Sequence, residues 1–184
     1  MIIALAGRRV DAPDAKTARF PPDNVPAVGA RLRNLFEREG ATALVCAAAC
    51  GADLVALSEA GALGMKRRII LPFERQRFRE ASVVDRPGDW GALFDRILDE
   101  VEAAGQLVVL HLSSDDEEAY DIASRAILDE AMSVARQASE KAEAVVVWEG
   151  ASRGEHDHSA LFVQEARDRG LSVLEVITTG LDAS

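Results

Sequence analysis

The chain has 184 residues, 48% of them hydrophobic and 28% charged, which is the composition of one globular domain rather than of a disordered segment. Its formal net charge of −10 argues against binding to nucleic acid or to an anionic membrane surface, because both require Lys and Arg to neutralise phosphates. A local basic cluster remains compatible with this charge, because binding depends on the local field.

The sequence predicts a cytoplasmic protein. Its apolar start, residues 1–7, is too short for the core of a secretory signal and lacks a basic leader. No apolar run approaches the length that spans a membrane. Only two cysteines occur, as expected in a reducing compartment. We therefore expect neither a membrane nor a nucleic acid among the partners.

Six short apolar runs alternate with helical patterns along the chain. They are rich in Val, Ile and Leu without polar alternation, as in strands buried on both faces of a parallel sheet. The runs are 2–6, 43–48, 68–73, 107–112, 144–148 and 171–177. Apolar residues recur at helical spacing over 28–36, 90–101, 120–134 and 162–166. Left-handed glycine caps are expected after helices at Gly40, Gly64, Gly105 and Gly170.

This alternation predicts an α/β fold, a single Rossmann-like domain over 1–184 with a mostly parallel, doubly wound sheet of about six strands flanked by helices. Numbering strands along the chain, we expect the order 3-2-1-4-5 with the sixth at the edge. The ligand crevice then lies between strands one and four, above Gly7. Two connections follow strands and should lie over this edge: 11–26, which is proline-rich and expected to be ordered but not helical, and 74–88, which is long and arginine-rich.

The segment CAAACGADLVALSEAGALGM, residues 46–65, raises the choice between a metal or redox site and a phosphate-binding turn. No third cysteine completes a zinc set, so we expect Cys46 in the core. At Cys50-Gly51-Ala52-Asp53 a strand meets a helix, where the missing side chain of Gly51, free N–H groups and the helix dipole favour an anion. Asp53 is expected to cap this helix or to reach a ribose hydroxyl. An ordinary capped turn explains the spacing equally well.

Arginines also collect after the predicted strands. In an acidic chain, such a ring at the carboxyl edge would form a local anion site, although Arg is this chain's usual cation. The arginines concerned are Arg8, Arg9, Arg75, Arg77, Arg79 and Arg153. His156-Asp157-His158 could ligate a metal, but a polar loop before a helix is the simpler interpretation, and we expect no metal. The motifs GxGxxG, GxxxxGK[ST] and GxSxG are absent, so no dinucleotide fingerprint, P-loop or nucleophile elbow is present.

Several short motifs occur in an order that can be compared with that of known families. They are Gly7-Arg8-Arg9, Gly51-Ala52-Asp53 before an alanine-rich helix, Leu71-Pro72-Phe73, Phe78 to Val83, and Trp148-Glu149-Gly150. Over most of the chain this order resembles the SLOG superfamily of Rossmann-like nucleotide-binding domains, which includes the DNA-processing protein A core and the LOG nucleosidases. It looks most similar to uncharacterised bacterial members, some of them attached to signalling modules. The resemblance implies a nucleotide site with a tyrosine, here Tyr120, near the nucleotide.

Two positions depart from that family pattern. Arg8 stands where the relatives have His in Gly-His-Arg, and Asp157-His158-Ser159 stands where they have Gly-Gly-Thr. An Asp there adds negative charge at the expected anion site, whereas Ser159 can still cap the last helix or bond a phosphate. The nucleosidase signature Pro-Gly-Gly-x-Gly-Thr-x-x-Glu is absent, so the resemblance does not imply glycosidic cleavage.

We therefore expect a domain that binds or senses a nucleotide or another phosphate-containing ligand, with no cofactor. The expected ligand-binding residues are Gly7, Arg8, Arg9, Cys50, Gly51, Ala52, Asp53, Arg75, Arg79, Ser82, Tyr120, Gly150, Arg153 and Ser159. Two other functions stay open: an N-glycosidic hydrolase using Glu59, Glu80 or Glu155, and a scaffold without a ligand. The sequence identifies no catalytic residue. It also leaves a homo-oligomer open, because the apolar face of 90–101 could serve a dimer or a core.

Overall fold

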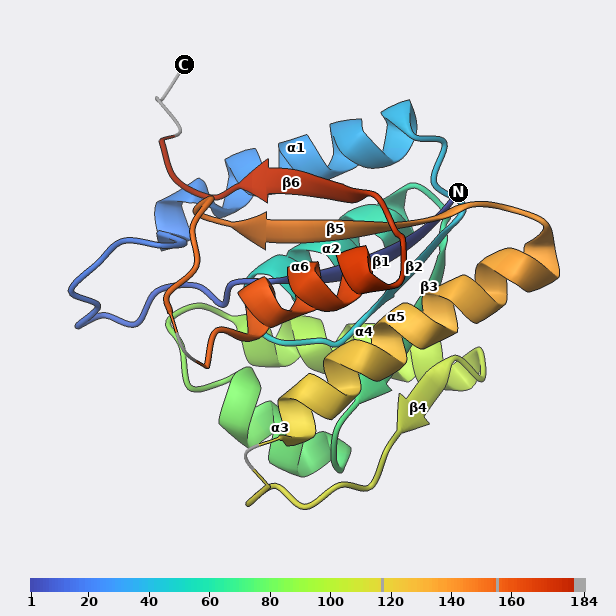
Figure 1. Cartoon of the computed structure of the whole chain (residues 1–184). Helices are drawn as coiled ribbons and strands as arrows, with labels where there is room; N and C mark the ends of the chain where they lie inside the picture. The colour runs from blue at the N-terminus through green and yellow to red at the C-terminus, as the bar shows by residue number, and fades with distance from the viewer. Residues whose placement is uncertain (117, 155, 181–184) are drawn as a thin grey trace.

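The computed structural model describes residues 1–116, 118–154 and 156–180, and these form a sheet with helices on both faces (Figure 1). The sheet is entirely parallel and contains six strands. They are β1 (Ile2–Gly7), β2 (Ala43–Cys46), β3 (Lys66–Leu71), β4 (Leu107–Val109), β5 (Ala142–Trp148) and β6 (Val173–Ile177). The predicted Rossmann-like α/β fold and all six strand positions are confirmed.

The predicted strand order is wrong in one respect. The observed order is β4-β3-β2-β1-β5-β6, so the fourth strand pairs with β3 at an edge and β5 takes the place beside β1. Burial explains the difference, because all three β4 residues are only partly buried whereas β5 is buried from Ala144 to Trp148. A central strand must be covered on both faces. The point at which the chain changes direction across the sheet therefore lies between β1 and β5.

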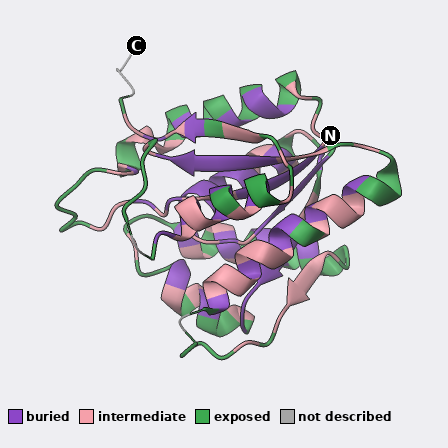
Figure 2. Cartoon of the chain, in the orientation of Figure 1, coloured by how far each residue is buried: buried purple, intermediate pink, exposed green. Residues whose placement is uncertain are grey.

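Six α-helices cover the sheet. They are α1 (Val25–Arg38), α2 (Ala52–Ala62), α3 (Arg75–Ser82), α4 (Trp90–Ala103), α5 (Ala119–Ala138) and α6 (His158–Asp168). Apolar residues of α1, α2, α3 and α4 pack with one face of the sheet, and those of α5 and α6 pack with the other. Figure 2 shows the buried strands between the two helical layers. No helix among the described residues is both long and apolar enough to cross a bilayer.

The connections differ in how well they were predicted. Helix α3 lies within 74–88, where a long connection was expected, and one apolar anchor holds it: Phe78 packs 6.0 Å from Phe73 and 6.2 Å from Phe94, measured between ring centroids. Segment 11–26 is non-helical as expected until a 3₁₀ turn, Pro22–Asn24, leads into α1. The four predicted glycine caps are confirmed, each with a φ between 59° and 75°.

Candidate functional site

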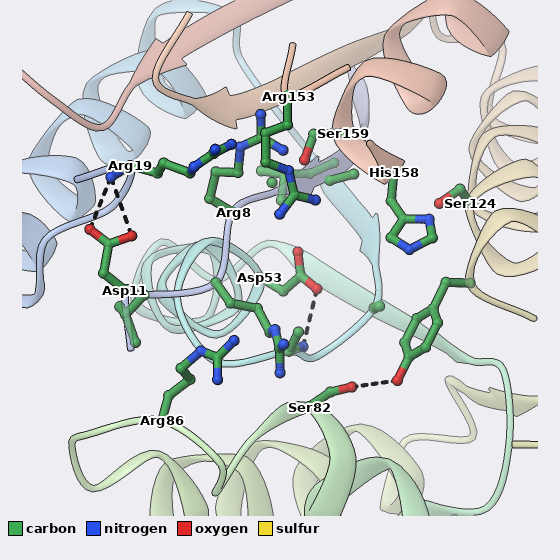
Figure 3. A pocket seen from close by; sticks show the side chains of 18 of the residues that line it. Arg8, Asp11, Arg19, Asp53, Ser82, Arg86, Ser124, Arg153, His158 and Ser159 are labelled. Atoms are coloured by element: carbon green, nitrogen blue, oxygen red, sulfur yellow. Dashed lines mark hydrogen bonds between the residues drawn. The ribbon is translucent and has the colours of Figure 1, made fainter. Parts of the chain in front are cut away.

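A cavity of about 530 Å³ opens over the carboxyl ends of β1, β2 and β3 (Figure 3). Its walls come from the loop after β1, the start of α2, helices α3 and α5, and the segment that leads into α6. Parallel α/β sheets hold ligands at this edge, and the volume is typical of a small-molecule site. The geometry therefore makes this cavity the candidate binding site.

The cavity lining is rich in positive charge although the chain is acidic. The cations that line it are Arg8, Arg9, Lys16, Arg19, Arg86 and Arg153, whereas the carboxylates that line it are Asp11 and Asp53. Three carboxylates that do not line the cavity, those of Asp85, Glu149 and Asp157, pair with several of these arginines. Which cations are available to a ligand therefore depends on these individual pairs.

Arg8 is fully committed to the protein itself. Its side chain is 4% exposed and bonds two carboxylates: Nε donates to Glu149 at 2.6 Å and Nη1 donates to Asp157 at 2.5 Å. Nη2 also donates to the carbonyl oxygen of Ala151 at 3.0 Å. Arg8 therefore closes an internal ion cluster and has little capacity left for a ligand.

Asp157 is the counterpart of Arg8 and also caps α6. Its Oδ1 accepts from the backbone N–H of Ser159 at 3.0 Å, and its Oδ2 accepts from that of Arg153 at 2.7 Å. Burial would raise the pKa of Asp157, but the bonds from Arg8 and from the backbone N–H groups of Arg153 and Ala160 hold it well below its usual range. The expectation that Ser159 could cap α6 is wrong, because Asp157 does so. The carboxylate thus occupies the helix N-terminus, where anions are favoured.

Arg8 and Asp157 therefore contact each other. The Arg8 guanidinium neutralises the Asp157 carboxylate. Asp157 does not leave an uncompensated negative charge in the cavity.

Arg153 and Arg19 are less well compensated. The Arg153 guanidinium lies 3.7 Å from Asp157, whose carboxylate already bonds Arg8. Burial and the nearby Arg8 charge lower the pKa of Arg153, which indicates that its positive charge is disfavoured. Arg19 lies 3.3 Å from Glu149, which Arg8 also shares. An anion placed between Arg153 and Arg19 would relieve this excess of positive charge.

Asp53 is a buried carboxylate that points into the cavity (Figure 3). Its Oδ2 accepts from the backbone N–H of Ala49 at 3.1 Å. The prediction that Asp53 caps α2 is wrong, because Gly51 is the N-cap residue and no side chain bonds there. Burial raises the pKa of Asp53 to about 7 and outweighs the opposing bond from Ala49.

The space beside Gly51 is filled by the chain itself. Its φ is 97°, and a Cβ there would lie 2.7 Å from the backbone nitrogen of Val10 and 2.8 Å from the carbonyl oxygen of Arg8. The backbone N–H of Ala52 donates to the same Arg8 carbonyl at 3.0 Å. The expectation that Gly51 leaves room for an anion is therefore wrong, and Cys50, Gly51 and Ala52 are absent from the cavity lining. Cys50 and Cys46 are both free and buried.

The arginines around α3 divide into two groups. Arg75 and Arg79 pair with Asp95 of α4, and neither lines the cavity, so the structure does not bring them to the expected site. Arg9 does line it, with its guanidinium 2.8 Å from the carboxylate of Asp85. Arg86, which was not predicted, lines it and shares that carboxylate.

Ser82 and Tyr120 both line the cavity, and their hydroxyl oxygens form a hydrogen bond of 2.8 Å. Both were predicted site residues, and Gly7, Arg153 and Ser159 line the cavity as well. Gly150 does not line it and takes a φ of 91° in the loop after β5.

His158 lines the cavity, although the sequence indicated it only as part of a possible metal-binding loop and not as a ligand-binding residue. Its Nδ1 lies 2.6 Å from the Asp121 carboxylate, and its ring centroid lies 5.6 Å from that of Tyr120. Tyr120, Ser124 and Ile127 all line the cavity from one face of α5. Their spacing of four and three residues was the signal that could have found this wall.

The carboxylates proposed for an N-glycosidic hydrolase do not support that function. Glu59 pairs with Arg33 and Glu80 accepts from Gln76, and neither lines the cavity. Glu155 lies outside the described residues. Within the described ranges, no group of three or more His, Cys, Asp or Glu side chains could hold a metal ion.

The chain matches no protein-family model, and no curated protein is significantly similar to it.

Proposed function

We propose that the chain binds a small phosphorylated ligand of nucleotide size in this cavity, as a nucleotide-binding or nucleotide-sensing domain. The observation that carries the proposal is the incompletely neutralised pair Arg153 and Arg19, whose nearest carboxylates already serve Arg8. A phosphate dianion between these two guanidiniums would form charge-assisted hydrogen bonds. Lys16, on the same loop as Arg19, adds a third cation to the lining.

The rest of the ligand would lie against the apolar part of the lining. Pro72, Phe78, Tyr120 and Ile127 line the cavity from α3, α5 and the end of β3. Such surfaces suit a planar base, because aromatic and aliphatic side chains pack on its faces. Asp53 would hydrogen-bond an oxygen atom of the ligand, donating when its carboxyl is protonated and accepting when it is ionised. This arrangement agrees with the resemblance to SLOG domains, which stays a prediction.

Thermal-shift titration would test the proposal with nucleoside monophosphates, cyclic nucleotides, ribose 5-phosphate and unphosphorylated adenosine. We expect phosphorylated compounds to stabilise the protein and adenosine to do so far less. Arg153→Ala should weaken that binding about 10- to 100-fold, since a hydrogen bond to a charged group contributes about 1.5–3 kcal/mol. Arg77→Ala is the matched control, because Arg77 is exposed and does not line the cavity.

Stabilisation by no compound, or equal weakening by both substitutions, would contradict the proposal.

Two alternatives receive less support. A carboxyl edge poor in arginine would favour a scaffold that has lost its site, but arginines line the cavity at this edge. The hydrolase that uses Glu59 or Glu80 requires carboxylates that lie outside the cavity.

A further inference from the structure

Two side chains able to transfer protons line the cavity from different elements: His158 at the start of α6 and Asp53 in the first turn of α2. We propose that the cavity is the active site of a phosphoester hydrolase, with His158 as the general base and Asp53 as the general acid. This inference rests on the proposed binding of a phosphorylated ligand and goes beyond it by naming the reaction.

The position of His158 is that of an oriented base. Its Nδ1 lies 2.6 Å from Asp121 of α5, so the carboxylate favours the tautomer that carries its proton on Nδ1. Nε2 is then the basic atom. The neighbouring Tyr120 ring packs against the imidazole, so two adjacent residues of α5 hold it. A purely structural ion pair between α5 and α6 would account for the His158–Asp121 bond. It would not require His158 to line the cavity, as it does.

One arginine of the expected phosphate site lies on the same side of the cavity as this base. Figure 3 shows Arg153, Ser159 and His158 together along one side of the cavity. A phosphoryl group bound on the side of Arg153 that faces His158 would place the phosphorus within reach of a water molecule that the imidazole deprotonates. The guanidinium would stabilise negative charge on the phosphoryl oxygens, which is the main requirement in phosphoryl transfer.

Asp53 supplies the second group. Its Oδ2 is held by the backbone of Ala49, whereas its Oδ1 accepts no hydrogen bond from any residue that the structure describes. Burial raises the pKa of Asp53 to about 7, so a large fraction of this carboxyl carries a proton near neutral pH. A carboxylic acid of this kind can protonate a leaving oxygen.

The proposed reaction is balanced without a further reactant. His158 Nε2 takes a proton from water as the water oxygen attacks phosphorus. The ester P–O bond breaks, and the leaving alkoxide takes the proton of Asp53. The products are an alcohol and hydrogenphosphate. Transfer of the extra proton from the imidazolium to the Asp53 carboxylate through solvent restores both groups.

The reaction would be tested by measuring phosphate release in the presence of a chelator. The two substrates, a nucleoside 5′-monophosphate and p-nitrophenyl phosphate, differ in their leaving groups. His158→Asn should lower kcat roughly 100- to 10,000-fold on both, the usual contribution of a general base. Asp53→Asn should lower kcat strongly on the nucleotide but little on p-nitrophenyl phosphate, because p-nitrophenolate leaves without protonation.

Asp121 is a positioning residue in this scheme. Asp121→Asn should lower kcat with little change in KM or melting temperature, and Asp121→Glu should recover part of the rate. Asp129→Asn is the matched control, because Asp129 lies on the same helix, pairs with Arg169 and does not line the cavity.

The outcomes separate this inference from the binding proposal. Binding of phosphorylated compounds without turnover by the wild-type protein would overturn the hydrolase and leave the binding function standing. Neither binding nor turnover would overturn both. Turnover that survives His158→Asn, or an equal loss on both substrates in Asp53→Asn, would refute the assigned roles.

Discussion

Replacing Asp53 by Asn is expected to stabilise the protein at neutral and alkaline pH, although it removes a cavity residue. Asp53 is 7% exposed, and burial raises its pKa to about 7 from an ordinary value of 3.8. A buried carboxylate whose only described partner is one backbone N–H is destabilising when charged. Asn keeps an oxygen acceptor for Ala49 and never carries the charge.

The pH dependence follows from the two pKa values. Below about pH 4 the carboxyl is protonated in both the folded and unfolded states, so its charge costs nothing. As pH rises towards 7, the unfolded chain releases this proton while the folded protein retains it, and the free energy of unfolding falls. Above pH 7 the loss is complete, at about three pH units times ~1.4 kcal/mol, or about 4 kcal/mol.

Urea denaturation of wild type and Asp53→Asn at pH 5.5 and pH 8 would measure this effect. The variant should be more stable at both values, and the gap should widen by about 2 kcal/mol between them, since about 1.5 pH units separate pH 5.5 from the folded pKa. Asp23→Asn, at an exposed position, should show no widening. A gap that is independent of pH, or a less stable variant at pH 8, would refute the argument.

Two further predictions concern the junction around β1. Gly51→Ala should lower the free energy of unfolding by about 3 kcal/mol or more in urea denaturation, because of strain at φ 97° and overlap with the backbone of Val10, whereas Gly64→Ala, with open space around it, should cost about 1 kcal/mol. Equal costs would argue against the close contact. Asp157→Asn should cost about 3 kcal/mol at pH 7, because it leaves the buried Arg8 with one carboxylate. A change below about 1 kcal/mol would show that the cluster contributes little.

The sequence predicts the strands well because each is a continuous apolar run, and the glycine caps because few other residues adopt that backbone. It does not predict the strand order, since the short runs that form β4 and β5 look similar until their burial is known. Helix α3 was missed for a related reason. Its sequence, RQRFREAS, contains one large apolar residue and therefore no helical period to recognise.

The cavity lies at the edge of the sheet where the sequence predicted a site, but several predicted residues behave differently from the expectation. The glycine turn does lie at the carboxyl edge, yet Gly51 admits the backbone of the β1 loop rather than an anion. Arginines that follow strands were expected to share one role. Whether each faces the cavity depends on acidic partners far away in the chain: Arg79 is drawn to Asp95 on α4, whereas Arg153 competes with Arg8 for Asp157. Sequence spacing carries no information on such long-range pairs.

The ion cluster around Arg8 determines where a ligand anion would bind. In a Rossmann-like sheet, the N-terminus of a helix beside the switch point is the usual place for a phosphate. Here the Asp157 carboxylate already accepts the amides at the start of α6, and Arg8 neutralises it. A second anion at that helix end would be repelled by Asp157. The remaining positive field comes from Arg153 and Arg19, farther out on the lining. Because Asp157 fills the usual phosphate position, the proposed ligand phosphate would bind to Arg153 and Arg19 rather than at this helix end.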